Sequence, residues 1–75
     1  MTFMELLARG DVAASTADHR ELERIAILLS SRVGDPLAGE CERLAHRCHS
    51  RRPHAHEAWP SLRAALAHRA SIAGT

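Results

Sequence analysis

Four residue types are missing from this 75-residue chain: lysine, asparagine, glutamine and tyrosine. All ten basic side chains are therefore arginine, and only Phe3 and Trp59 carry aromatic rings. Proteins that read DNA bases commonly use Asn, Gln or Lys beside Arg, and single strands stack on rows of aromatic side chains. The formal net charge is only +1. These features argue against a dedicated nucleic-acid-binding domain.

Long apolar runs are also missing. No stretch approaches the roughly 18 apolar residues that a membrane-spanning helix needs. The opening sequence MTFMELLARG lacks the basic start and the apolar run of a secretory signal peptide. The two cysteines do not amount to a disulfide framework. We therefore expect a cytoplasmic protein that does not contact a membrane.

Motifs for catalysis and cofactor binding are absent from the sequence as well. It contains no G-x-S-x-G element, phosphate-binding loop or dinucleotide fingerprint, and neither H-E-x-x-H nor C-x-x-C. A chain of this length forms one domain at most, here residues 1–75, and has little volume for a ligand cleft. We predict a protein that is not an enzyme and uses no cofactor.

Helix signals are frequent, and no segment alternates like a β-strand. The stretch 2–5 fits a capping box, and 18–21 is a looser version of it. Asp35 followed by Pro36 is typical of an N-cap and a first helical residue, while Gly10 and Gly34 are typical stops. The sequence predicts an all-α fold, a small bundle of three to four short helices. Their expected ranges are about 3–9, 18–33, 36–52 and 60–73, with an extra turn possible from residue 55.

The third predicted helix has a narrow apolar face. Leu37, Cys41, Leu44 and Cys48 fall within one stripe when residues are placed at 100° steps. Free cysteine behaves as a small apolar residue, so both thiols are expected in the core. Trp59 is expected to pack on the stripe at Leu44 and Cys48.

The second predicted helix has more apolar surface than one facing layer covers. Leu22, Ala26, Leu29 and Val33 form one stripe, which Ile25, Ile27 and Leu28 widen. One interpretation buries Ile27 and Leu28 beneath the first helix of a monomer. The other, which we favour, is a homodimer whose interface includes Ile25, Ile27 and Leu28.

Charge is unevenly distributed along the chain. Residues 1–40 carry four Arg and seven acidic residues, whereas residues 41–75 carry six Arg, two acidic residues and five of the six His. An antiparallel homodimer would place each acidic half against the basic half of the other copy. Arg43, Arg47 and Arg51 follow the spacing i, i+4, i+8 of one helix edge, which Arg52 extends. Arginine suits paired contacts with carboxylate or phosphate, so this ridge predicts an acidic protein partner, with nucleic acid as the alternative.

Four histidines surround the end of the third predicted helix: His46, His49, His54 and His56. His46 and His49 lie on one helical face, so the four are weak candidates for a metal site or a pH-responsive cluster. Their spacing matches no established zinc pattern, and we expect no metal there. The leading hypothesis is a small protein-interaction module, such as an adaptor, assembly factor, chaperone-like binder or inhibitor.

Overall fold

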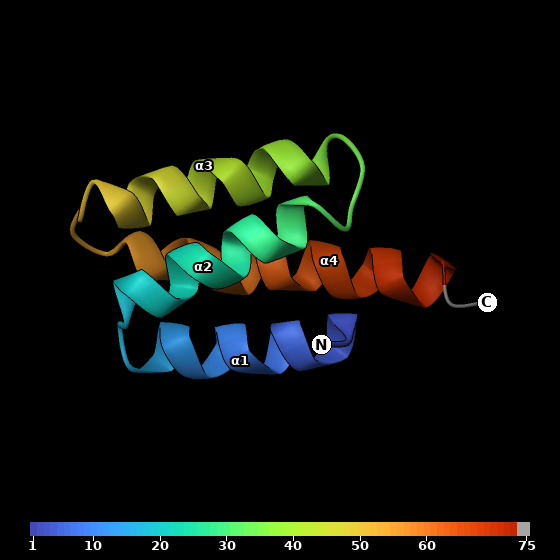
Figure 1. Ribbon diagram of the computed structural model, residues 1–75, viewed down its shortest axis with the longest axis horizontal. Helices are drawn as coiled ribbons and strands as arrows, with labels where there is room; N and C mark the ends of the chain where they lie inside the picture. The colour runs from blue at the N-terminus through green and yellow to red at the C-terminus, as the bar shows by residue number, and fades with distance from the viewer. Residues whose placement is uncertain (74–75) are drawn as a thin grey trace.

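The computed structural model describes the backbone of residues 1–73 and the side chains of residues 1–71. Over residues 1–73 the chain forms α-helices and one short 3₁₀ helix, without a strand. The elements are α1 (Phe3–Ser15), α2 (His19–Ser30), α3 (Leu37–His49), the 3₁₀ helix η1 (Ala55–Ala58) and α4 (Trp59–Ala73) (Figure 1). The predicted all-α bundle is confirmed.

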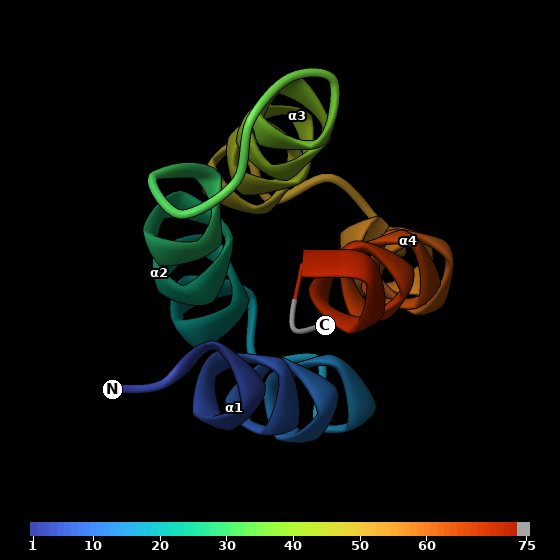
Figure 2. The same cartoon turned by 90° about the vertical axis from the view of Figure 1, so that its right-hand side faces the viewer.

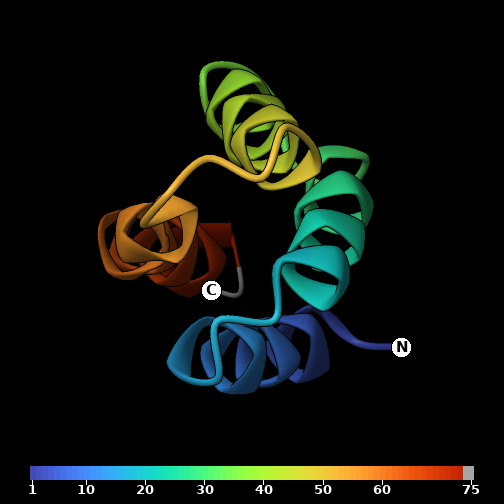
Figure 3. The ribbon, with the colours of Figure 1, turned by 90° about the vertical axis from the view of Figure 1, so that its left-hand side faces the viewer.

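The four helices surround a common centre. Viewed from either end, α1, α2, α3 and α4 follow one another around the bundle (Figure 2, Figure 3). The packing is most extensive between α2 and α3 and next between α1 and α2, whereas α4 packs less closely on α3 and α1. The fourth helix thus closes the ring while leaving space beside α3.

Side-chain caps explain where the first two helices begin. The Thr2 hydroxyl accepts a hydrogen bond of 3.1 Å from the Glu5 amide, and the Glu5 carboxylate accepts one of 3.4 Å from the Thr2 amide. The predicted capping box is therefore confirmed. At the start of α2, the Asp18 carboxylate accepts a hydrogen bond of 3.2 Å from the Glu21 amide. Each cap satisfies an amide that the first helical turn leaves without a backbone partner.

The prediction that Gly10 ends the first helix is wrong. α1 continues to Ser15, and Gly10 is buried within it. A Cβ atom at this position would lie 2.3 Å from Cζ2 of Trp59. Glycine at position 10 leaves free the space that the indole ring fills. Its helix propensity is lower than that of alanine, which is unfavourable for α1.

The second and third helices are shorter than predicted. α2 ends at Ser30, where the hydroxyls of Ser30 and Ser31 donate hydrogen bonds to the carbonyls of Ile27 and Leu28. Such bonds compete with those of the helix. The N-cap prediction for Asp35 is also wrong, because Pro36 holds the cap position of α3 without a side-chain hydrogen bond.

α3 ends at His49, three residues before the predicted boundary. The Ser50 hydroxyl donates a 2.9 Å hydrogen bond to the His46 carbonyl, and Arg51 adopts the left-handed region with φ of 54°. The Arg52 amide then donates a 3.2 Å hydrogen bond back to the Arg47 carbonyl. This pattern closes the helix end much as a Schellman motif does, with an arginine in the place that glycine usually takes.

The core collects the apolar faces of all four helices. Its members larger than alanine are Leu6, Leu7, Leu22, Ile25, Leu29, Cys41, Leu44, Cys48, Trp59, Leu62 and Leu66. Both cysteines are buried and free, as predicted. Trp59 belongs to the same cluster as Leu44 and Cys48, and its ring lies against Gly10 of α1.

Candidate functional site

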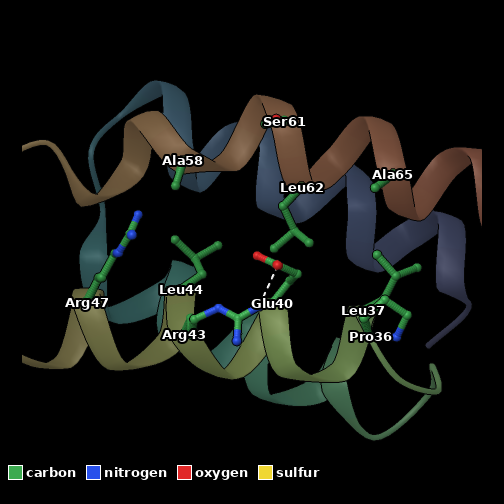
Figure 4. Close-up of a pocket in the computed structure, with 10 residues that line it drawn as sticks. All are labelled: Pro36, Leu37, Glu40, Arg43, Leu44, Arg47, Ala58, Ser61, Leu62 and Ala65. Atoms are coloured by element: carbon green, nitrogen blue, oxygen red, sulfur yellow. Dashed lines mark hydrogen bonds and ion pairs between the residues drawn. The ribbon is translucent and has the colours of Figure 1, made fainter.

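A groove of about 470 Å³ runs between α3 and α4 (Figure 4). It exists because α4 lies beside α3 without packing closely along its length. Ten residues line it, six before or within α3 and four from the η1–α4 segment. They are Pro36, Leu37, Glu40, Arg43, Leu44, Arg47, Ala58, Ser61, Leu62 and Ala65.

The floor of the groove is apolar. Leu44 of α3 and Leu62 of α4 point toward one another across it (Figure 4). Leu37 lies seven residues before Leu44, which is two helical turns, so both side chains lie on the same face of α3. Ala65 follows Leu62 by three residues on the α4 wall. The result is a strip of aliphatic carbon flanked by two roughly antiparallel helices (Figure 1).

The α3 edge of the groove is charged. Arg43 and Arg47 lie one turn apart there, and the Arg47 side chain extends across the groove toward Ala58 (Figure 4). Arg43 forms an ion pair with Glu40, whose carboxylate points into the groove. Among residues 1–71, no ion pair of Arg47 is found. At this edge the guanidinium of Arg47 has no ion-pair partner among the described residues, whereas that of Arg43 is paired with the exposed carboxylate of Glu40.

The predicted arginine ridge is only partly assembled. Arg43 and Arg47 reach the groove, but Arg51 and Arg52 lie beyond the end of α3 and are exposed outside the groove lining. The spacing i, i+4, i+8 assumed a helix that continues past Arg51. The left-handed backbone of Arg51 ends that geometry, so the ridge has two members on the helix and two after it.

Sequence reasoning missed the α4 wall of the groove. Leu62 is a core residue, but nothing in its spacing shows that α4 stands apart from α3 at this point. The Glu40–Arg43 pair could have been found, because residues three apart on a helix are neighbours. The position of this pair inside a groove could not be found from the sequence.

The acidic residues of the first half are largely paired within the chain. Glu21 contacts Arg9 at 3.3 Å across α1 and α2, and Asp11 accepts hydrogen bonds from both Arg63 at 3.2 Å and Trp59 at 2.8 Å. These partners come from neighbouring helices of the same molecule. The electrostatic complementarity that the sequence offered to a second copy is therefore partly used inside one copy.

The three residues predicted as a protein interface separate in the structure. Ile25 is fully buried with 0% exposure, so the prediction that it forms part of an interface surface does not hold. Its position on α2 faces the bundle centre together with Leu22 and Leu29. Ile27 and Leu28 remain 54% and 40% exposed, which also excludes their burial beneath α1.

His46 and His49 lie on the outer side of α3, near α2. Nδ1 of His49 lies 3.1 Å from a Glu23 carboxylate oxygen. His46 and His49 also line a shallow hollow of about 250 Å³ together with Glu23 and Ile27. These histidines thus contribute to the contact between α2 and α3 rather than to the groove.

His54 directly precedes the 3₁₀ helix η1, and His56 lies within it. Nδ1 of His54 contacts the Glu57 carboxylate at 3.1 Å, while the ring of His56 lies 6.4 Å from that of His54 and 5.9 Å from that of His19. His19 is distant in sequence and was not predicted to join them. Within the part of the chain that the structure describes, no group of three His, Cys, Asp or Glu side chains is placed to hold a metal ion.

The two thiols are held in the neutral form. Burial, followed by the nearby carboxylates of Glu40 and Glu42, raises the pKa of Cys41 to about 11. Burial and the Glu23 carboxylate also raise the pKa of Cys48. Because the thiolate is the nucleophile and the metal ligand, these environments favour a structural role for both cysteines.

Comparison with known proteins finds no matching family model, no similar curated protein and no similar solved structure. None of the described helices is long and apolar enough to cross a membrane.

Proposed function

We propose that this chain is a non-catalytic protein-interaction module, of the adaptor, assembly-factor, chaperone-like or inhibitor kind, and that the α3–α4 groove receives its partner. The observation that carries the proposal is the combination of an aliphatic floor with an arginine edge. Leu44 and Leu62 are already buried, so burial would be gained at the half-buried Leu37 and the exposed Ala65 beside them. Arg43 and Arg47 would orient the bound segment.

The chemistry of the lining favours binding over catalysis. Its only titratable side chains are Glu40, Arg43 and Arg47, and its only hydroxyl belongs to Ser61. A serine nucleophile needs an adjacent base, commonly histidine, and the lining has none. An extended groove between two helices also suits a peptide segment better than a small molecule.

A nucleic acid is the alternative occupant. Arg47, Arg51 and Arg52 are exposed near one end of α3 and would suit phosphate. Glu40 and Glu42 on the same helix would repel a polyanion, and Glu40 points into the groove itself. These carboxylates favour a protein partner.

Self-association through α2 is a separate part of the proposal. Ile27 and Leu28 are the two large apolar side chains that α2 leaves exposed, and neither lines the α3–α4 groove. A two-fold axis near them would pair α2 with α2 of a second copy. Such a homodimer would leave both α3–α4 grooves open to a partner.

Photo-crosslinking tests the location of the binding site. Random 20-residue peptides are selected on the wild-type chain, and the chain then carries benzoylphenylalanine at Ser61, which lines the groove, or at Ala64. Ala64 is exposed on the same helix but does not line the groove. We expect the selected peptides to crosslink at position 61 and not at 64. Equal crosslinking at both positions, or no selected binder, would overturn the proposal.

A further inference from the structure

We infer that the occupant of the α3–α4 groove is an acidic amphipathic helix of about three turns belonging to a protein partner. The inference rests on the proposed function, because it names the partner of the same groove. It is carried by the length of the groove, the spacing of its apolar side chains and the position of its charges.

The length of the groove fits a short helix. Leu37 and Arg47, near its two ends, are ten residues apart on α3. At 1.5 Å per residue this corresponds to about 15 Å along the helix axis. A docked helix of three turns has the same length and would lie between α3 and α4.

The floor sets the spacing of the partner's apolar residues. Leu37 and Leu44 are two turns apart, and Leu62 faces Leu44 from the other wall. Helices that dock in grooves present apolar side chains at i, i+3 or i+4, and i+7. Side chains at i and i+7 would lie over Leu37, which is half-buried, and over the already buried Leu44, and one at i+3 or i+4 would lie between them.

The charged edge determines the sign of the charge that we expect on the partner. Arg43 and Arg47 are one turn apart, so carboxylates at i and i+4 on a parallel or antiparallel helix could meet both. Arg51 and Arg52 follow close to the same end of α3. A helix with acidic residues along one side therefore matches this edge, and a basic helix would be repelled.

Glu40 occupies the place of a partner carboxylate in the unbound chain. It pairs with Arg43 and points into the groove, and both side chains are more than half exposed. Exposed pairs of this kind contribute little to stability, so Arg43 can exchange Glu40 for another carboxylate. Glu40 therefore weakens binding of the partner in two ways. It competes for Arg43, and it repels the carboxylates of the partner. Removal of its charge should strengthen binding.

A matched pair of designed peptides tests the inference. Both are 14-residue helices with leucine at i, i+3, i+4 and i+7; one carries glutamate along one flank, and the other carries glutamine at the same positions. Fluorescence anisotropy with the full chain gives Kd for each peptide. We expect the glutamate peptide to bind about threefold to tenfold more tightly than the glutamine peptide, because Arg47 gains a charge pair and Arg43 exchanges Glu40 for a peptide carboxylate.

Variants of the chain assign the charges. Arg43→Gln and Arg47→Gln should each weaken binding of the glutamate peptide about threefold and leave the glutamine peptide unchanged. Glu40→Gln should strengthen the binding of the glutamate peptide about threefold. Arg24→Gln, on the exposed outer side of α2, is the control for a change in net charge. Circular dichroism of each variant checks that the fold is retained.

Failure of this inference is distinguishable from failure of the proposed function. If both peptides crosslink at position 61 with equal affinity and the arginine variants have no effect, the groove binds proteins but the acidic partner is wrong. If a 20-nucleotide single strand or duplex binds more tightly than the glutamate peptide and depends on Arg43 and Arg47, the inference is overturned in favour of nucleic acid. If position 61 crosslinks to a second copy of the chain and the peptide does not compete, the occupant is the chain itself.

Discussion

The indole of Trp59 lies directly against Gly10 of α1. A Cβ atom on Gly10 would be 2.3 Å from Cζ2 of the ring, and the indole Nε1 donates a 2.8 Å hydrogen bond to the carboxylate of the next residue, Asp11. The ring is only 2% exposed. One turn of α1 thus supplies both the space for the chain's only tryptophan and the acceptor for its polar atom.

We predict that Gly10→Ala destabilises the fold. Overpacking usually costs about 1–3 kcal/mol, and the better helix propensity of alanine returns about 1, so the expected net loss is up to about 2 kcal/mol. The control is Gly39→Ala in α3, whose Cβ would meet only the end of the Arg43 side chain at 3.6 Å. That variant should gain up to about 1 kcal/mol. Urea unfolding measures both; a stabilising Gly10→Ala would contradict the close packing.

We predict that Trp59→Ala costs about 3–5 kcal/mol, the usual loss for a fully buried large aromatic side chain. Asp11, which also accepts a hydrogen bond from Arg63, would lose the one from the indole. The native wild type should show blue-shifted tryptophan emission that moves to longer wavelength on unfolding. Emission at a water-exposed maximum in the native state would refute the burial of Trp59.

The helices could be predicted from the sequence because their signals are local. The capping box at Thr2 and Glu5 and the Asp18 cap involve residues three apart, and the core stripes follow from helical periodicity. The role of Gly10 could not be predicted, since it depends on Trp59 from the far end of the chain. The sequence alone does not distinguish a glycine that ends a helix from one that leaves space for a neighbouring ring.

The candidate site was predictable only on its α3 side. Arg43 and Arg47 share an edge because of their spacing, and the structure places both at the groove. Arg51 leaves that edge because its backbone turns left-handed, which no residue type in the stretch indicates. Ile25 and Ile27 differ by two positions on α2, yet one is buried and the other exposed. Which flank of a wide apolar face is covered depends on where the neighbouring helices cross it.

We predict that stability falls between about pH 9 and pH 11 because of the thiols. Burial raises the pKa of Cys41 from 9.0 to about 11, so the unfolded chain loses this proton first and rising pH favours unfolding. Lysine and tyrosine, which normally titrate in this range, are absent from the chain. Urea midpoints measured from pH 8 to pH 11 should decrease through this window.

The control for the alkaline prediction is Cys41→Ala combined with Cys48→Ala. This double variant is expected to be less stable at pH 8, because two buried sulfur atoms are lost, but its urea midpoint should vary much less from pH 9 to pH 11. A decline as steep as that of the wild type would show that another process causes the loss.

We predict that Ile27→Glu with Leu28→Glu abolishes self-association and leaves the fold intact. Both side chains are largely exposed in the monomer, so the charged replacements need not enter the core. Sedimentation equilibrium should show a concentration-dependent dimer for the wild type and a monomer for the double variant, with unchanged circular dichroism. A wild type that is monomeric at all concentrations would contradict the homodimer.

The hydrogen bond between Asp11 and Trp59 joins residues 48 positions apart in sequence. By contrast, α2 and α3 are consecutive helices, and their contact requires only a short loop to close. Loop-closure entropy delays contacts between distant residues, so the seating of Trp59 on α1 should come late in folding, after the α2–α3 pair. In a stopped-flow experiment, the change in tryptophan fluorescence would therefore time the meeting of the first and last helices, while far-ultraviolet circular dichroism would follow the formation of the helices before it.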